Sequence, residues 1–230
     1  MPNFDGSQAP ADAERRFDGW PGDPEWKDLT QALVQRAPGA WPGALDDFLR
    51  TTRARKRSMG PRTCRVFVSH QHLDAQRALR IAWLADQNGF EYWLDVHDPV
   101  LRLANNSVLP PPVHSILVAG IIEMALLNCT HVISVQTTHA AGSRWVPYEF
   151  GRGKEHLLVS DQAASWFDAG LTPTAAADYL HLGVCVYSDD DVDAWFQSQQ
   201  HRGCQAAGSS WSGPVPPPLP GPPPRRWPWP

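Results

Sequence analysis

The sequence predicts an α/β fold with three layers, in which a central parallel sheet of about five strands has helices on both faces. The main observation is a strand, helix and strand pattern within residues 65–95. Residues 66–68 form an apolar run typical of a strand buried on both faces. Apolar residues then recur every three or four positions between Asp74, a suitable helix N-cap, and Gly89. Residues 90–94 predict a second strand, so the unit implies parallel pairing.

Strand and helix patterns continue to alternate downstream, which is the second observation. Residues 96–112 are interpreted as a long connection, because prolines and asparagines interrupt any regular pattern. Loops of this length are usually functional or disordered, and this one follows a strand's carboxyl end, where ligands bind in parallel sheets. Residues 113–128 predict a largely buried helix. The remaining expected elements are strands over 131–135, 157–159 and 182–187, helices over 145–154 and 189–200, and a weakly helical stretch over 160–180.

Both ends of the chain differ from this alternating region, which we assign to residues 61–201. Residues 1–60 are predicted to form an N-terminal extension with two short helices and a basic linker. Residues 202–230 contain ten prolines, which favour a disordered, extended tail without helix or strand. The PxxP pattern of this tail could dock on an aromatic groove, or the tail could be dispensable.

Charge and composition limit the expected partners. Residues 61–201 contain fifteen acids and eight Lys or Arg, which gives a net charge of −7. No binding to nucleic acid is expected, because that binding depends on clustered basic side chains. Neither a signal peptide nor an apolar run of membrane-helix length is present, so we expect a cytoplasmic protein without membrane contact. The four cysteines are widely spaced and are expected to be reduced.

Three short motifs fall at the carboxyl edge of the predicted sheet. They consist of VFVSH at 66–70 with Asp74, Gly89-Phe90 with Trp93 and Asp95, and the S-x-W-x-x-x-E pattern of Ser143, Trp145 and Glu149. Each motif is short, but the three occur in the same order as in one known family. With them, residues 62–200 resemble the Toll/interleukin receptor (TIR) domain in its bacterial soluble form.

The resemblance implies a flavodoxin-like TIR fold and one of two activities. TIR domains either cleave the nicotinamide glycosidic bond of NAD, in bacteria often in antiviral defence, or assemble as scaffolds in signal transduction. NAD would then be a substrate, and no cofactor is expected. Homotypic self-association is implied in both cases, and an unidentified sensor protein would be a further partner.

The resemblance also implies a catalytic carboxylate on or just before the helix that follows the second strand. Nicotinamide is already a cationic leaving group, so the enzyme mainly needs a carboxylate that orients the ribose and stabilises an oxocarbenium-like centre. Glu123 is the single Glu between Glu91 and Glu149, and it is the only charged residue of its helix. We therefore predict Glu123 as the catalytic residue. The alternative interpretation is an ordinary solvent-facing acid.

Further site residues are expected from their positions at the strand ends. Those expected to contact the substrate are Ser69, His70, Trp93, Asp95 and Trp145. Either tryptophan could stack on a ring of the ligand or belong to the core. Those expected to cap or brace the structure are Asp74, Ser143 and Glu149. The histidines and acids match no metal-ligand spacing, so no metal is expected, and no glycine-rich loop indicates Rossmann-type binding.

Three functions are therefore open after the sequence analysis. The prediction is a TIR-type NAD glycohydrolase. The alternatives are a non-catalytic TIR-type module, which binds a partner or a nucleotide signal through oligomerisation, and a plain flavodoxin-like nucleotide binder. Because one fold supports many functions, the geometry of the site has to distinguish them.

Overall fold

In the part of the chain that the structure describes, five strands form one parallel sheet, in the order β2-β1-β3-β4-β5. The predicted α/β architecture with a parallel sheet of about five strands is thereby confirmed. The computed structural model describes residues 64–154, 161–171, 177–200, 211 and 213–220. The N-terminal extension and the strand predicted at 157–159 lie outside these residues. The strands are β1 (Arg65–Ser69), β2 (Glu91–Trp93), β3 (His131–Gln136), β4 (Ala163–Phe167) and β5 (Val184–Val186).

The strand order places a switch point at β1. From β1 the chain crosses to β2 on one side, and after β2 it returns to β3 on the other side of β1. Connections that leave a parallel sheet in opposite directions open a crevice at the carboxyl ends of the strands. The turns after β1, β2 and β3 therefore surround the position at which a ligand is expected.

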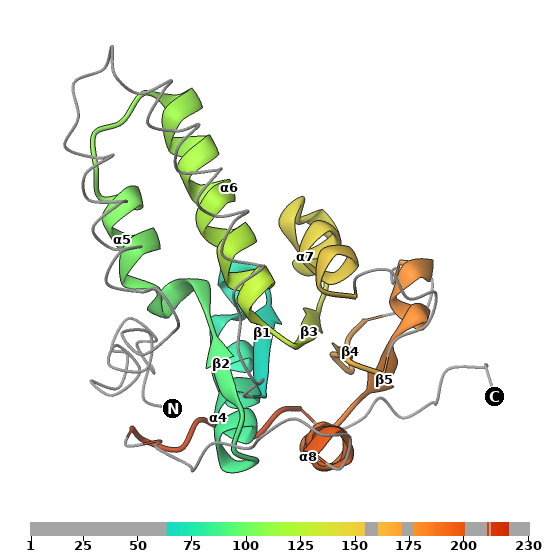
Figure 1. Cartoon of the computed structure of the whole chain (residues 1–230). Coiled ribbons are helices and arrows are strands. Elements are labelled where there is room, and N and C mark those ends of the chain that lie inside the picture. Colours follow the sequence, from blue (N-terminus) through green and yellow to red (C-terminus); the bar gives the residue numbers. More distant parts are fainter. Residues whose placement is uncertain (1–63, 155–160, 172–176, 201–210, 212, 221–230) are drawn as a thin grey trace.

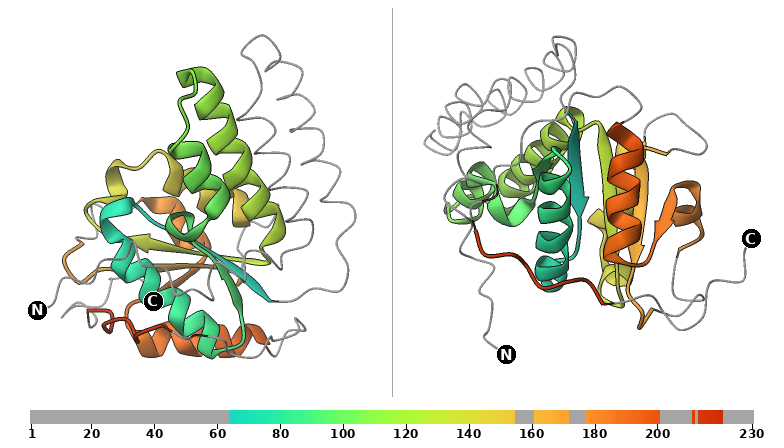
Figure 2. Two further views of the ribbon diagram at one scale, coloured as in Figure 1. Left: turned by 90° about the vertical axis from the view of Figure 1, so that its left-hand side faces the viewer. Right: turned by 90° about the horizontal axis from the view of Figure 1, so that it is seen from below.

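Helices cover both faces of the sheet and complete the three layers (Figures 1 and 2). The helices α4 (Ala75–Gln87) and α8 (Asp189–Gln200) lie on one face. On the other face lie α6 (Pro111–Asn128) and α7 (Trp145–Lys154), with α5 (Pro99–Asn105) packed against α6. Short 3-10 helices occur at His72–Asp74, Asp95–His97, Ala140–Gly142 and Asp178–Leu182.

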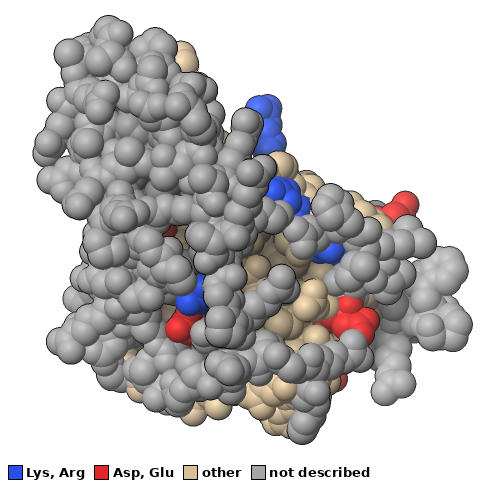
Figure 3. Space-filling view, in the orientation of Figure 1, with Lys and Arg blue, Asp and Glu red and all other residues tan. Residues whose placement is uncertain are grey.

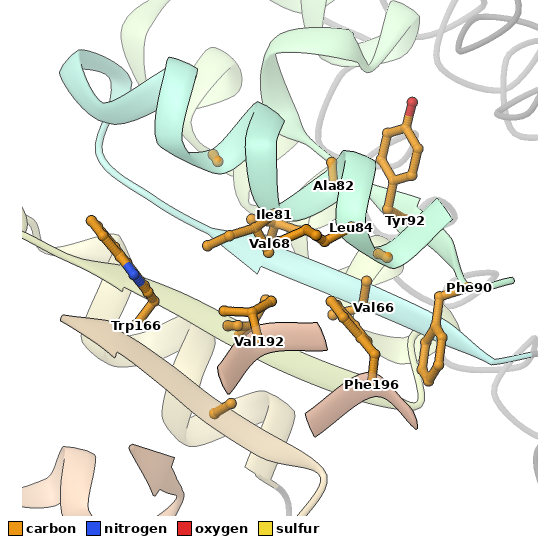
Figure 4. Packing of buried hydrophobic residues seen from close by; sticks show 14 of the residues in the cluster. Val66, Val68, Ile81, Ala82, Leu84, Phe90, Tyr92, Trp166, Val192 and Phe196 are labelled. Carbon is orange, nitrogen blue, oxygen red and sulfur yellow. The ribbon is translucent and has the colours of Figure 1, made fainter. Parts of the chain in front are cut away.

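Alternate residues of β1 enter different hydrophobic clusters. Val66 and Val68 pack with Ile81 of α4 and Phe196 of α8 on one face of the sheet (Figure 4). Phe67 joins the other cluster, beneath α6 and α7. Every residue of β1 is buried. A strand covered on both faces needs a continuous apolar run, which is the signal that predicts it in the sequence.

The connection after β2 contains the helix α5, whereas the sequence predicted a loop. Asp98 caps this helix, because its Oδ1 accepts a hydrogen bond from the backbone N–H of Leu101 at 2.9 Å. Pro99 occupies the first helical position, where proline is favourable. Leu101 and Ala104 are buried. The prediction was wrong because Pro99 was interpreted as a breaker, although proline interrupts a helix only beyond its first turn.

The strand β4 lies within residues 160–180, which the sequence predicted to be weakly helical. All five of its residues are buried, and they pair with β3 on one side and β5 on the other. Ala163, Ala164 and Ser165 have little intrinsic strand preference, so the local sequence gave the wrong conformation. Burial between two neighbouring strands outweighs that local preference.

Three further observations concern the cysteines, the tail and the helices. Cys129 and Cys185 are free thiols, as expected, but Cys64 is disulfide-bonded rather than reduced. Residues 213–220 belong to the tail that the sequence predicts to be extended, and the structure places them as an extended segment against α4 and α8. None of the described helices combines the length and apolar composition needed to cross a membrane.

Two glycines of α7 provide a matched test of its packing on β3. A Cβ atom on Gly153 would lie 2.7 Å from Cβ of Val132, whereas one on Gly151 would meet no atom within 4 Å. We predict that Gly153→Ala lowers the free energy of unfolding by about 1–3 kcal/mol through overpacking. Gly151→Ala should raise it by about 0.5–1 kcal/mol, because alanine favours the helix. Urea unfolding measures both, and equal effects would contradict the close approach of α7 to β3.

Candidate functional site

A cavity of about 580 Å³ lies at the carboxyl ends of β1, β2 and β3. Its lining combines the turns after these strands with side chains from α5, α6 and α7. The polar residues that follow the strands include His70, Gln71 and His72 after β1, Asp95 after β2, and His139 after β3. The helices contribute Leu101, Ile122, Trp145 and Glu149. The cavity therefore occupies the position that the strand order indicates.

Glu149 is the buried acid of this lining, with 6% of its surface exposed. The start of α7 fixes its position, because Ser143 Oγ accepts hydrogen bonds at 3.2 Å from the backbone N–H groups of Trp145 and Val146. Glu149 follows just over one turn later. Its Oε2 accepts a hydrogen bond from Ser69 Oγ at 2.5 Å, which joins α7 to the end of β1.

Burial raises the pKa of Glu149 from 4.5 to about 7. The hydrogen bond donated by Ser69 opposes this rise, because it favours the ionised carboxylate, and the negative charge of Asp95 adds to it. With a pKa of about 7, both protonation states of Glu149 are populated at neutral pH. Such a group can exchange a proton or supply a negative charge during a reaction.

Asp95 and His70 form a second polar pair in the cavity lining. His70 Nδ1 lies 3.1 Å from the carbonyl oxygen of Val68, which can only accept a hydrogen bond, so this nitrogen is the donor. The other ring nitrogen, Nε2, lies 3.3 Å from Asp95 Oδ1. Asp95 Oδ1 also accepts a hydrogen bond from the backbone N–H of Val96 at 2.7 Å. The turn after β2 thus lies against the turn after β1 beside the cavity.

Asp74 connects the segment after β1 to the turn after β3, next to His139 of the cavity lining. Its buried carboxylate accepts hydrogen bonds from Thr137 Oγ1 at 2.6 Å and from Arg77 Nη1 at 3.2 Å, and Oδ1 lies 3.2 Å from His139 Nδ1. Asp74 precedes α4, as predicted for an N-cap, yet its side chain makes no capping hydrogen bond. Its structural role is to orient His139 and the turn after β3.

The electrostatic character of the cavity lining is acidic. Asp95 and Glu149 are its acids, its other ionisable residues are His70, His72 and His139, and none of its described residues is Lys or Arg. On the face shown in Figure 3, the described Lys and Arg side chains lie apart from one another rather than in one patch. Two carboxylates without a nearby Lys or Arg in the described lining favour a ligand group that is cationic or becomes cationic during reaction.

Most of the predicted site residues lie together at the cavity. Ser69 contacts Glu149, and His70, Asp95, Ser143 and Trp145 are part of the lining. Trp145 has 38% of its surface exposed, and its ring meets the ring of Tyr148 edge to face at 5.8 Å. Its indole is accessible to a ligand at the rim of the cavity.

Trp93 and Glu123 are placed differently. Trp93 is buried, stacks on Phe67 with a ring-centroid distance of 4.6 Å, and donates a hydrogen bond from Nε1 to Asp98 at 2.8 Å. It lies in the core, which was the alternative interpretation of this tryptophan. Glu123 is not part of the described lining; it pairs with Arg152, whose Nη2 lies 2.6 Å from Oε1, and accepts a hydrogen bond from Tyr148.

Two parts of this site were not predicted from the sequence. His139 was not singled out, although it lies in the turn after β3, where a polar residue at the carboxyl edge is a signal in itself. Glu149 was assigned a bracing role. Glu149 lies four residues after Trp145, so both side chains are on the same face of α7. This spacing is a sequence signal for a shared site.

Comparisons with known proteins add no relatives to this description. The chain matches no protein-family model, no curated protein and no solved structure. Among the described residues, no group of three or more His, Cys, Asp and Glu side chains could hold a metal ion. The cavity and its carboxylates are therefore the features from which a function can be inferred.

The stability of the protein should show the cost of burying Glu149. Because its folded-state pKa of about 7 exceeds the ordinary 4.5, its contribution to stability is complete below about pH 4.5 and is lost as the pH rises through about 7. A shift of this size corresponds to roughly 3 kcal/mol. We predict that Glu149→Gln, which cannot ionise, is more stable than the wild type by up to that amount at pH 8 and equally stable at pH 4.

Urea unfolding at the two pH values measures this difference. Glu123→Gln is the matched control, because it removes a partly exposed ion pair with Arg152. It should lower stability by no more than about 1 kcal/mol at pH 8. An identical stability difference between Glu149→Gln and the wild type at both pH values would contradict the raised pKa.

Proposed function

We propose that this chain is a TIR-type enzyme that cleaves the nicotinamide glycosidic bond of NAD in the cytoplasm, with Glu149 as its catalytic carboxylate. The observation that carries the proposal is the buried Glu149 in the lining of an acidic cavity at the switch point of the sheet. The three sequence motifs support the same function. From the same motifs we also propose that the protein self-associates, that it acts in signalling for antiviral defence, and that a partner protein senses infection.

The chemistry fits the charges of the cavity. In NAD the bond to be cleaved joins C1′ of the ribose to the positively charged nicotinamide nitrogen. When this bond breaks, its electron pair passes to the nitrogen, nicotinamide leaves as a neutral molecule, and the positive charge develops on the ribose. Ionised Glu149 stabilises that charge, and Asp95 adds a second negative charge. Water then attacks C1′ and releases a proton, which gives ADP-ribose.

The position of Trp145 supports binding of a flat ring. Its exposed indole lies at the cavity one turn before Glu149, so a pyridinium ring stacked on it would place the scissile bond towards the carboxylate. A cationic ring on the face of a tryptophan gains electrostatic attraction as well as contact area. Two residues of α7 would thus act together: Trp145 would hold the leaving group, and Glu149 would lie near the reacting carbon.

Glu149 fits the catalytic role better than Glu123, which the sequence analysis placed there. The Arg152 guanidinium makes two hydrogen bonds to Glu123 Oε1, so much of that charge is already compensated. The hydroxyl of Tyr148 occupies the other oxygen at 2.7 Å. A carboxylate with these partners, outside the described cavity lining, is less available to a developing cation than Glu149.

Nicotinamide release by matched variants tests the assignment. We predict that Glu149→Gln lowers kcat by about 10²–10³-fold, because one preorganised electrostatic group is removed from the reacting centre. Glu123→Gln should retain activity within a few-fold of the wild type. The assay uses concentrated protein with NAD, since the resemblance implies activity in an assembled state. Loss of activity in Glu123→Gln with retention in Glu149→Gln would contradict the assignment.

The pH dependence of the reaction provides a second test. Because ionised Glu149 is the active form and its pKa is about 7, kcat/KM should rise with pH and level off above about pH 7. Below that value each pH unit should lower it about tenfold. A profile that is flat between pH 5 and pH 8 would contradict the role of Glu149. Binding of NAD without nicotinamide release would favour the non-catalytic module.

A further inference from the structure

The extended segment of residues 213–220 lies on the face that α4 and α8 present to solvent (Figures 1 and 2). Among the described residues, two hydrogen bonds join its backbone to α4 and α8. Arg80 Nη1 of α4 donates to the carbonyl oxygen of Pro216 at 2.9 Å, and the N–H of Leu219 donates to Asp189 Oδ1 of α8 at 3.1 Å. Upstream, the N–H of Trp211 donates to Asp86 Oδ2 of α4 at 3.0 Å.

Burial along this segment repeats every three residues. Pro216 and Leu219 are buried and Gly213 is partly buried, whereas the other residues of the segment are exposed. A polyproline II helix has three residues per turn, so positions 213, 216 and 219 form one of its edges. The segment therefore contacts α4 and α8 as a polyproline II helix would contact a receptor.

The α4–α8 face, defined here as Arg80, Trp83, Asp86 and Asp189, is organised to receive such a backbone. The Arg80 guanidinium lies 4.1 Å from the ring centroid of Trp83, and its Nη2 donates to Asp189 at 2.8 Å. These two contacts hold Arg80 in place while its Nη1 reaches the segment. Arg80 donates to the carbonyl oxygen of Pro216, and Asp189 accepts from the N–H of Leu219, three residues later.

Apolar contacts complete the recognition. Leu219 has 7% of its surface exposed and belongs to the core cluster beneath α4 and α8. The ring centroid of Trp211 lies 6.1 Å from that of Tyr92, and Trp211 packs against the same cluster. Paired polar contacts to the backbone, together with one deeply seated side chain per turn, are features of a specific ligand site.

We propose that the α4–α8 face is a recognition site for a polyproline II segment with proline and leucine three residues apart, and that residues 213–220 of the same chain occupy it in cis. The chain favours this occupant because only residues 201–212 separate it from α8. A short connection of this kind gives an effective concentration in the millimolar range. The same sequence supplied as a free peptide should therefore bind only when the attached segment is displaced.

Binding of a labelled peptide spanning Trp211 to Pro220 to full-length protein variants tests the proposal. Leu219→Asp in the protein places a carboxylate in an apolar position beside Asp189 and should vacate the site. Val215→Asp is the matched control, because Val215 has 61% of its surface exposed and the segment should stay in place. We expect the peptide to bind the Leu219→Asp protein at least tenfold more tightly than the wild type or the control, as measured by fluorescence anisotropy.

Variants of the peptide compare sequences on one and the same protein. The peptide that carries Leu219→Asp should lose at least tenfold in affinity for the vacated protein, and the peptide that carries Val215→Asp should bind like the unmodified one. No binding of the unmodified peptide to the Leu219→Asp protein would overturn the recognition site. Equal binding to that protein and to the wild type would overturn occupancy in cis, as would a wild-type dimer held together by exchanged segments.

Discussion

The hydrogen bond from Ser69 to Glu149 is the contact on which the candidate site depends. It joins the last residue of β1 to the second turn of α7, and so it connects the sheet to a helix that follows β3. The carboxylate that accepts this bond is buried, and a buried charge is costly unless its hydrogen bonds are satisfied. The position of Glu149 beside the cavity is thus fixed by the same interaction that makes its burial tolerable.

The other polar contacts around the cavity extend this arrangement to the neighbouring strand ends. His70, after β1, lies close to Asp95, after β2. Asp74 contacts Thr137 and His139 in the turn after β3. Each pair joins two segments that are distant in the sequence but adjacent in the parallel sheet. Holding these charged groups in fixed positions lowers the stability of the fold, which is common at functional sites.

The sequence predicted the framework better than the site. The apolar runs of β1 and β3 and the periodic pattern of α4 are local signals, and all three elements occur where they were expected. The small residues of β4 carry no such signal, because neighbouring strands rather than local preference determine their conformation. Pro99 misled the prediction because its effect depends on whether it begins a helix or interrupts one.

The roles of the two glutamates show why the site was harder to predict. Glu123 stood out because it is the one charge in an apolar helix, but its partners Tyr148 and Arg152 come from another helix and cannot be inferred from spacing along α6. Glu149 was recognised only as part of a motif. Its burial, its contact with Ser69 and its proximity to Asp95 exist only in the folded chain.

The most direct test of the central claim is the ionisation of Glu149 itself. Protein labelled with ¹³C at the glutamate side-chain carboxyl groups can be titrated by NMR, with the Glu149→Gln variant to assign the resonance. A Glu149 midpoint near pH 7 is predicted, because burial raises the pKa to about 7. A midpoint near its ordinary value of 4.5 would show that the carboxylate is solvated and would contradict the proposed site.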